Sequence, residues 1–82
     1  MLLSAALLAQ QTVTGKVTDA NGLPLAGISV QTTKTGRGTA TAADGTFRLT
    51  VSADDQIELT GVGYVTQTVS PGTGVLNITL VQ

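Results

Sequence analysis

A strict two-residue alternation of apolar and polar side chains, directly after an Asp-Gly pair, most constrains the fold of this chain. Phe47, Leu49 and Val51 alternate with Thr and Arg residues. Successive side chains of a β-strand point to opposite faces of a sheet, so this pattern predicts a half-buried strand. Asp44-Gly45 predicts a turn, because glycine adopts positive φ without steric cost. The preceding residues also alternate, so the stretch 38–51 predicts one β-hairpin with a connection of about three to five residues.

Phe47 is the only phenylalanine in the chain. An aromatic ring buries more apolar area than any aliphatic side chain, so Phe47 is predicted to lie in the core with the other strands packed around it.

The same alternation recurs along the rest of the chain, and no helical period persists after Thr12. Turn residues separate the segments, and Pro24 marks 23–27 as an edge or linker because proline cannot donate to a strand ladder. About seven short strands at this spacing predict an all-β sandwich or small barrel, in which the inward faces are hidden from water. The further strands are expected at 12–18, 28–33, 56–60, 64–69 (Val65 and Val69 opposite Tyr64) and 75–81 (Leu76, Ile78 and Leu80 inward).

The first ten residues differ from the rest, because Met1–Gln10 is apolar without alternation. The run is too short to cross a bilayer as a helix, and it matches the apolar region and cleavage end of a secretory signal peptide. No Lys or Arg precedes it, which departs from that pattern. The alternative is an apolar N-terminal strand or buried helix. The expected division is a signal-peptide remnant at 1–11 and one domain at 12–82.

The composition removes most kinds of active site. The chain has no cysteine and no histidine, which excludes disulfides, thiolate metal sites and a serine–histidine nucleophile. Its four basic residues are scattered, so no nucleic-acid partner is expected. Every Asp falls at a predicted turn, and the calcium-loop-like start at Asp19 lacks the later ligands. Asn77-Ile78-Thr79 matches a glycosylation sequon but lies in a predicted strand. No catalytic, cofactor or metal site is predicted.

Residues distributed over about 12–81 form a pattern that resembles the carboxypeptidase regulatory-like domain. It begins with the run 14–30, continues through Gly38-Thr39, Thr41, Asp44-Gly45, Phe47, Leu49 and Val51, and ends with Val62-Gly63-Tyr64 and Leu80. The residues that carry this motif have structural roles, since the family has no catalytic residues to transfer. They are Gly15, Asp19, Gly22, Pro24, Gly27, Asp44, Gly45, Phe47, Gly63 and Tyr64.

The resemblance implies a seven-stranded transthyretin-like (prealbumin-like) Greek-key sandwich. Within this family, the chain most resembles the N-terminal extension of SusC/RagA-type TonB-linked outer-membrane transporters. In those proteins the extension follows a signal peptide. The chain is therefore expected to be a non-enzymatic periplasmic accessory domain of a glycan or peptide uptake system. Its expected partner is a protein or the parent barrel, with no ligand of its own and no membrane insertion. The alternatives are a small secreted carbohydrate-binding module and a regulatory appendage of a metallocarboxypeptidase.

Overall fold

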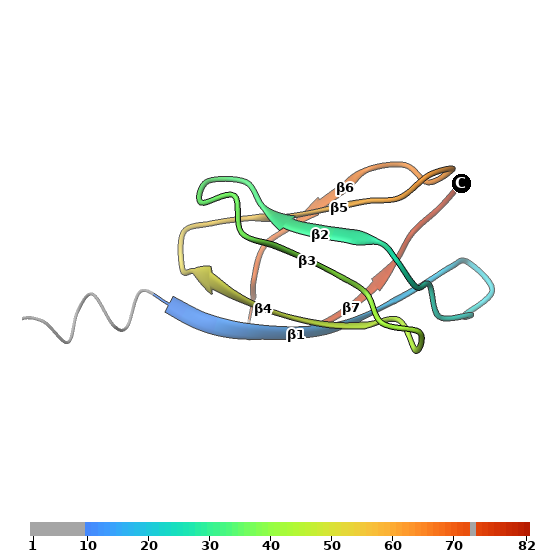
Figure 1. The fold of residues 1–82 in the computed structure, drawn as a ribbon, viewed down its shortest axis with the longest axis horizontal. Helices are drawn as coiled ribbons and strands as arrows, with labels where there is room; N and C mark the ends of the chain where they lie inside the picture. The colour runs from blue at the N-terminus through green and yellow to red at the C-terminus, as the bar shows by residue number, and fades with distance from the viewer. Residues whose placement is uncertain (1–9, 73) are drawn as a thin grey trace, which may run out of the picture.

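The chain folds into seven β-strands and no helix within the residues that its computed structural model describes, 10–72 and 74–82 (Figure 1). No helix in these residues is long and apolar enough to cross a membrane. The strands are β1 (Gln10–Thr18), β2 (Ser29–Thr32), β3 (Gly38–Ala40), β4 (Thr46–Ser52), β5 (Ile57–Thr60), β6 (Gln67–Val69) and β7 (Val75–Thr79).

The strands form two sheets, of order β4-β1-β7 and β3-β2-β5-β6, that face each other as a β-sandwich. β1 is the central strand of the first sheet. It runs antiparallel to β4 and parallel to β7, so that Gly15 lies beside both Phe47 and Leu76. All pairs in the second sheet are antiparallel. The predicted count of seven strands is confirmed.

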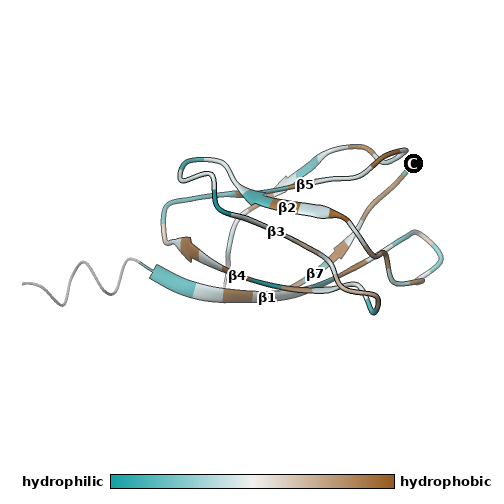
Figure 2. Cartoon of the chain, viewed as in Figure 1, coloured by the Kyte–Doolittle hydropathy of each residue, from teal (hydrophilic) through white to brown (hydrophobic). Residues whose placement is uncertain are grey.

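The core lies between the sheets and is built from the alternate apolar residues of both inner faces. In Figure 2 the hydrophobic colour recurs along strands of both sheets. Phe47 is only 6% exposed, which confirms its predicted place in the core. The inward alternation predicted for 12–18, 28–33, 46–52, 56–60 and 75–81 is confirmed as well. The buried apolar residues are Val13, Val17, Ile28, Val30, Phe47, Leu49, Val51, Ile57, Leu59, Ile78 and Leu80.

The hairpin predicted for 38–51 is wrong in its pairing, although its turn is correct. Ala42 N–H donates to the carbonyl of Thr46 at 2.8 Å, and Gly45 has a φ of 80°. However, β3 pairs with β2 and β4 pairs with β1, so the turn carries the chain from one sheet to the other. β1 offers β4 a ladder of seven residue pairs, whereas β3 is only three residues long. Alternation identifies a strand but does not identify its neighbour.

The strand predicted for 64–69 is shorter than expected, because only Gln67–Val69 pairs with β5. Tyr64 N–H donates to the carbonyl of Gly61 at 3.1 Å in a turn. Because of this turn, the residues before β6 do not follow the two-residue alternation of a strand. As a result Tyr64 and Val69 both pack against the core, whereas Val65 is exposed. The predicted opposition of Tyr64 to Val69 is therefore wrong.

β1 begins at Gln10, two residues before the expected domain start at Thr12. The preceding residues of the expected signal peptide, 1–9, lie outside the described part of the chain.

Candidate functional site

Most of the residues in the predicted motif lie at one end of the sandwich, where β1 ends. The loops 19–28, 41–45 and 61–66 meet the last residues of the chain here, at the end that carries the C-terminus in Figure 1. Val17 N–H donates to the carbonyl of Gly45 at 2.8 Å, and Leu80 N–H donates to that of Thr18 at 2.9 Å. Val65 N–H donates to the carbonyl of Val81 at 2.8 Å. We call this region the loop-packed end.

The Asp44-Gly45 turn is locked against β1. A Cβ added to Gly45 would lie 2.5 Å from the carbonyl oxygen of Val17 and 3.1 Å from Cβ of Pro24. Asp44 Oδ1 accepts hydrogen bonds from the hydroxyl and the N–H of Thr46, at 2.6 and 3.1 Å, and these bonds lower the pKa of Asp44. Asp44, Gly45 and Pro24 therefore hold the turn in place.

The loop that contains Asp19 is an Asp-stabilised turn. Asp19 Oδ1 accepts hydrogen bonds from the N–H groups of Asn21 and Leu23, at 2.8 and 3.0 Å, and Gly22 has a φ of 85°. Asp suits this position because its short side chain accepts hydrogen bonds from backbone groups two and four residues ahead. Asp19 therefore holds the turn between Thr18 and Leu23.

Buried Thr41 joins two loops at the same end. Its hydroxyl donates to the carbonyl of Leu25 at 2.6 Å and accepts the N–H of Ile28 at 3.0 Å. Gly27 N–H donates to the carbonyl of Thr41 at 2.9 Å, with Gly27 at a φ of 74°. Gly63, at a φ of 87°, belongs to the turn that seats Tyr64 against the core. These residues also serve the packing of loops.

Gly15 and Phe47 face each other across the β1–β4 ladder. A Cβ on Gly15 would lie 2.5 Å from Cζ of Phe47, so the phenyl ring occupies the space that a side chain would need. Glycine at position 15 is therefore required by the ring rather than by the backbone, since its φ is not positive. The sequence motif contains both members of this pair, and the structure brings them into contact.

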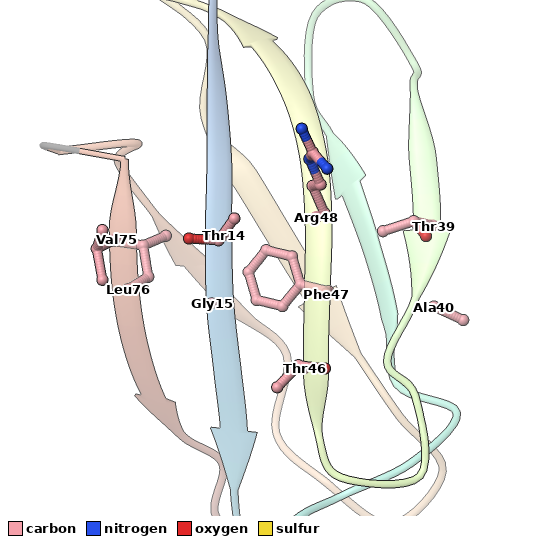
Figure 3. Close-up of a pocket in the computed structure, with 9 residues that line it drawn as sticks. All are labelled: Thr14, Gly15, Thr39, Ala40, Thr46, Phe47, Arg48, Val75 and Leu76. Carbon is pink, nitrogen blue, oxygen red and sulfur yellow. The ribbon is translucent and has the colours of Figure 1, made fainter.

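A shallow, open groove runs beside this pair, and Figure 3 shows the residues that line it. They come from β7, β1, β4 and β3, and they combine threonine hydroxyls with small and medium apolar side chains. Arg48 is the only charged residue among them. Such a lining can receive a side chain or a short extended segment, but it offers no nucleophile paired with a base.

Asp55 is a buried carboxylate. The sequence did not distinguish it from the other aspartates at predicted turns. It is 1% exposed and lies at the end of the sandwich opposite the loop-packed end, between β4 and β5. It accepts the N–H of Gln56 at 2.8 Å and that of Lys34 at 2.9 Å. It also accepts the hydroxyls of Thr33 and Thr35, at 3.2 and 3.1 Å, and the N–H of Thr35 at 3.3 Å. One carboxylate thus holds the loop between β2 and β3.

The same hydrogen bonds shift the ionisation of Asp55. Burial alone raises the pKa of the carboxyl, but the donors from Lys34, Gln56, Thr35 and Thr33 outweigh it and lower the pKa from 3.8 to about 2. A carboxyl with a lower pKa in the folded than in the unfolded chain stabilises the fold above the unfolded value. That stabilisation is lost as the pH falls from about 4 through about 2.

Asp55→Asn is expected to lower the urea midpoint at pH 7, because an amide N–H₂ would face the donors of Thr35. It is also expected to reduce the fall in midpoint between pH 4 and pH 2, since the titrating group is gone. The measurement is urea denaturation across pH 2–7. Asp54→Asn is the matched control, because Asp54 is exposed and makes only a surface ion pair with Lys34 at 3.1 Å. This role is contradicted if the urea midpoint falls equally between pH 4 and pH 2 in wild type and in Asp55→Asn.

Within residues 10–72 and 74–82, no three carboxylate, histidine or cysteine side chains gather where they could hold a metal ion. No buried side-chain N or O atom of this part of the chain lacks a hydrogen-bond partner. The buried polar side chains of these residues are therefore satisfied by hydrogen bonds within the fold.

A two-sheet sandwich whose motif aspartates hold turns defines a small all-β domain. The sequence model of the CarboxypepD_reg-like domain matches residues 13–80, from β1 to the residue after β7. The chain belongs to the CarboxypepD_reg-like domain family. A comparison with curated proteins found no match.

Proposed function

We propose that this chain is a non-enzymatic accessory domain that acts by attachment to another protein, in the periplasm of a Gram-negative cell. The observation that carries the proposal is the family match across the whole sandwich, residues 13–80. The proposed setting is the N-terminal extension of a SusC/RagA-type TonB-dependent transporter, or a subunit that works beside one. Glycans or peptides are then handled by the barrel, and the domain contributes position or partner contact.

The fold proposed with this function is the transthyretin-like Greek key. The orders β4-β1-β7 and β3-β2-β5-β6 support it, because the chain moves between the sheets after β1, β3, β4 and β6. The parallel pairing of the first and last strands supports it too.

The roles of the carboxylates support a domain without chemistry of its own. Asp19, Asp44 and Asp55 each accept backbone hydrogen bonds in a turn. A general base or nucleophile needs a free group beside its partner in a cleft, and these three carboxylates lie in separate loops.

The experiment expresses the full chain with a C-terminal epitope in a Gram-negative host that carries such an uptake system. The expected result is a processed chain in the periplasmic or outer-membrane fraction. An amine-reactive crosslinker, which can act at Lys16 and Lys34, should join it to an outer-membrane transport protein. A chain that stays unprocessed in the cytoplasm, or that crosslinks to no envelope protein, contradicts the proposal.

Direct carbohydrate binding is the competing function, and the positions of the two aromatic residues disfavour it. Phe47 is buried and Tyr64 is half-buried against the core, so neither ring is fully exposed for stacking on a sugar. Calorimetric titration with oligosaccharides and divalent metal ions is expected to give no saturable heat. A saturable signal would favour the binding module over the attachment domain.

A further inference from the structure

β4 is an edge strand whose outer side is unpaired. It forms one side of the sheet β4-β1-β7, and its neighbour beyond the edge, β3, belongs to the other sheet. Among residues 10–72 and 74–82, β1 is the only strand that pairs with it. At seven residues it is the longest edge strand described, compared with three for β3, three for β6 and five for β7.

The hydrogen-bond pattern shows which groups of β4 point outward. Val17 donates to Gly45, so by the alternation of an antiparallel ladder Phe47, Leu49 and Val51 bond to β1. The N–H and C=O groups of Thr46, Arg48, Thr50 and Ser52 then point away from β1. Ala42 and Asp55 donate to the carbonyls of Thr46 and Ser52. Within residues 10–72 and 74–82, no hydrogen bond reaches the outward backbone groups of Arg48 and Thr50, which have the spacing that another strand requires.

Proteins protect such edges with lysines, prolines, bulges or short strands. β3 and β6 are short, but β4 has neither proline nor lysine and only one charge, Arg48. The groove of Figure 3 extends from β7 across β1 to this edge, where Thr46 and Arg48 of β4 face Thr39 and Ala40 of β3. An added strand would therefore find open backbone groups and a recess for a side chain.

The charges of this sheet indicate what kind of strand fits. β4, β1 and β7 together contain Lys16 and Arg48 and no carboxylate, although the whole chain carries a net charge of −1. Both basic side chains are exposed, and the described residues give Arg48 no ion pair. A partner strand with an acidic side chain opposite Arg48 would complement this local positive charge.

We infer that the free edge of β4 binds an extended, acidic segment of a partner protein, which adds to the sheet as a fourth strand. This inference rests on the proposed attachment function and names the site at which it occurs. Backbone hydrogen bonds to Arg48 and Thr50 supply affinity, and a carboxylate on the partner strand supplies register by pairing with the Arg48 side chain.

The test uses two capped synthetic peptides that alternate Val with Thr and carry one central Glu or one central Lys. Amide NMR of the full chain is expected to show shifts and slowed hydrogen exchange at Arg48 and Thr50 with the Glu peptide. Arg48→Glu should reverse the preference between the peptides. Thr50→Pro removes an outward N–H without touching the β1 ladder, and it is expected to weaken binding about tenfold or more.

Asn77→Pro is the matched control on the opposite edge, β7. Thr14 donates to Gly74 and Leu80 donates to Thr18, so by alternation Asn77 N–H also points outward. This variant is expected to bind the Glu peptide as wild type does.

The inference is overturned by no response at β4, by an equal response to both peptides, or by a response that moves to β7. A concentration-dependent protection of Arg48 and Thr50 without peptide also overturns it, because the occupant is then a second copy of the chain. The peptide assay does not depend on export. A chain that crosslinks to a transporter but fails this assay retains the proposed function and loses only the site.

Discussion

Phe47→Ala is expected to lower the free energy of unfolding by about 3–5 kcal/mol, the usual cost of deleting a buried phenyl ring. The ring is 6% exposed and covers Gly15, so no other side chain can fill the space that it leaves at β1. A domain of this size has roughly 5–15 kcal/mol in total. The variant is therefore expected to be partly or wholly unfolded at room temperature.

Urea denaturation followed by circular dichroism measures this effect. Val75→Ala on β7 is the control, because Val75 is 69% exposed and its truncation should change stability by less than about 0.5 kcal/mol. A Gly15→Ala variant adds a second check. A methyl at position 15 meets the ring in wild type, whereas in the Phe47→Ala background its closest remaining contact is the carbonyl oxygen of Leu76 at 3.2 Å, so its cost should fall there. An unchanged midpoint for Phe47→Ala places the ring outside the core.

Gly45→Ala is expected to be the most damaging of the glycine substitutions in the turns. It combines two costs, because Gly45 has a φ of 80° and its Cβ would meet the Val17 carbonyl at 2.5 Å. The left-handed conformation costs an L-residue about 1–2 kcal/mol. The clash with a backbone group of the central strand adds about 1–3 kcal/mol, as for other overpacked sites.

Gly22→Ala isolates the first cost. Gly22 has a similar φ of 85°, but a Cβ there would meet nothing within 4 Å. The denaturant midpoint of Gly45→Ala should therefore be lower than that of Gly22→Ala, because only Gly45→Ala carries the additional cost of the clash. Equal midpoints would mean that the Asp44-Gly45 turn is not locked against β1.

The sequence alone predicted most strands and most of the core. Alternation predicted a strand after the Asp44-Gly45 turn that ends at Val51, one residue before the observed end of β4 at Ser52, and it correctly turned Val30, Leu59 and Ile78 inward. These predictions succeed because the two-residue period is a local property of the strand, and burial of one face follows from it. The Asp44-Gly45 turn was also predictable, because positive φ at Gly45 depends on the residue itself.

Strand pairing and the role of Asp55 were decided by the tertiary structure. The sequence placed β3 and β4 in one hairpin, but β1 supplies a longer ladder for β4 from thirty or more residues away. Asp54 and Asp55 look alike in the sequence, yet only Asp55 is buried, under a loop about twenty residues earlier. The open edge of β4 likewise exists only because β3 joined the other sheet. Side-chain periodicity is local, whereas pairing and burial depend on which distant segments meet, and that is settled by packing the whole core.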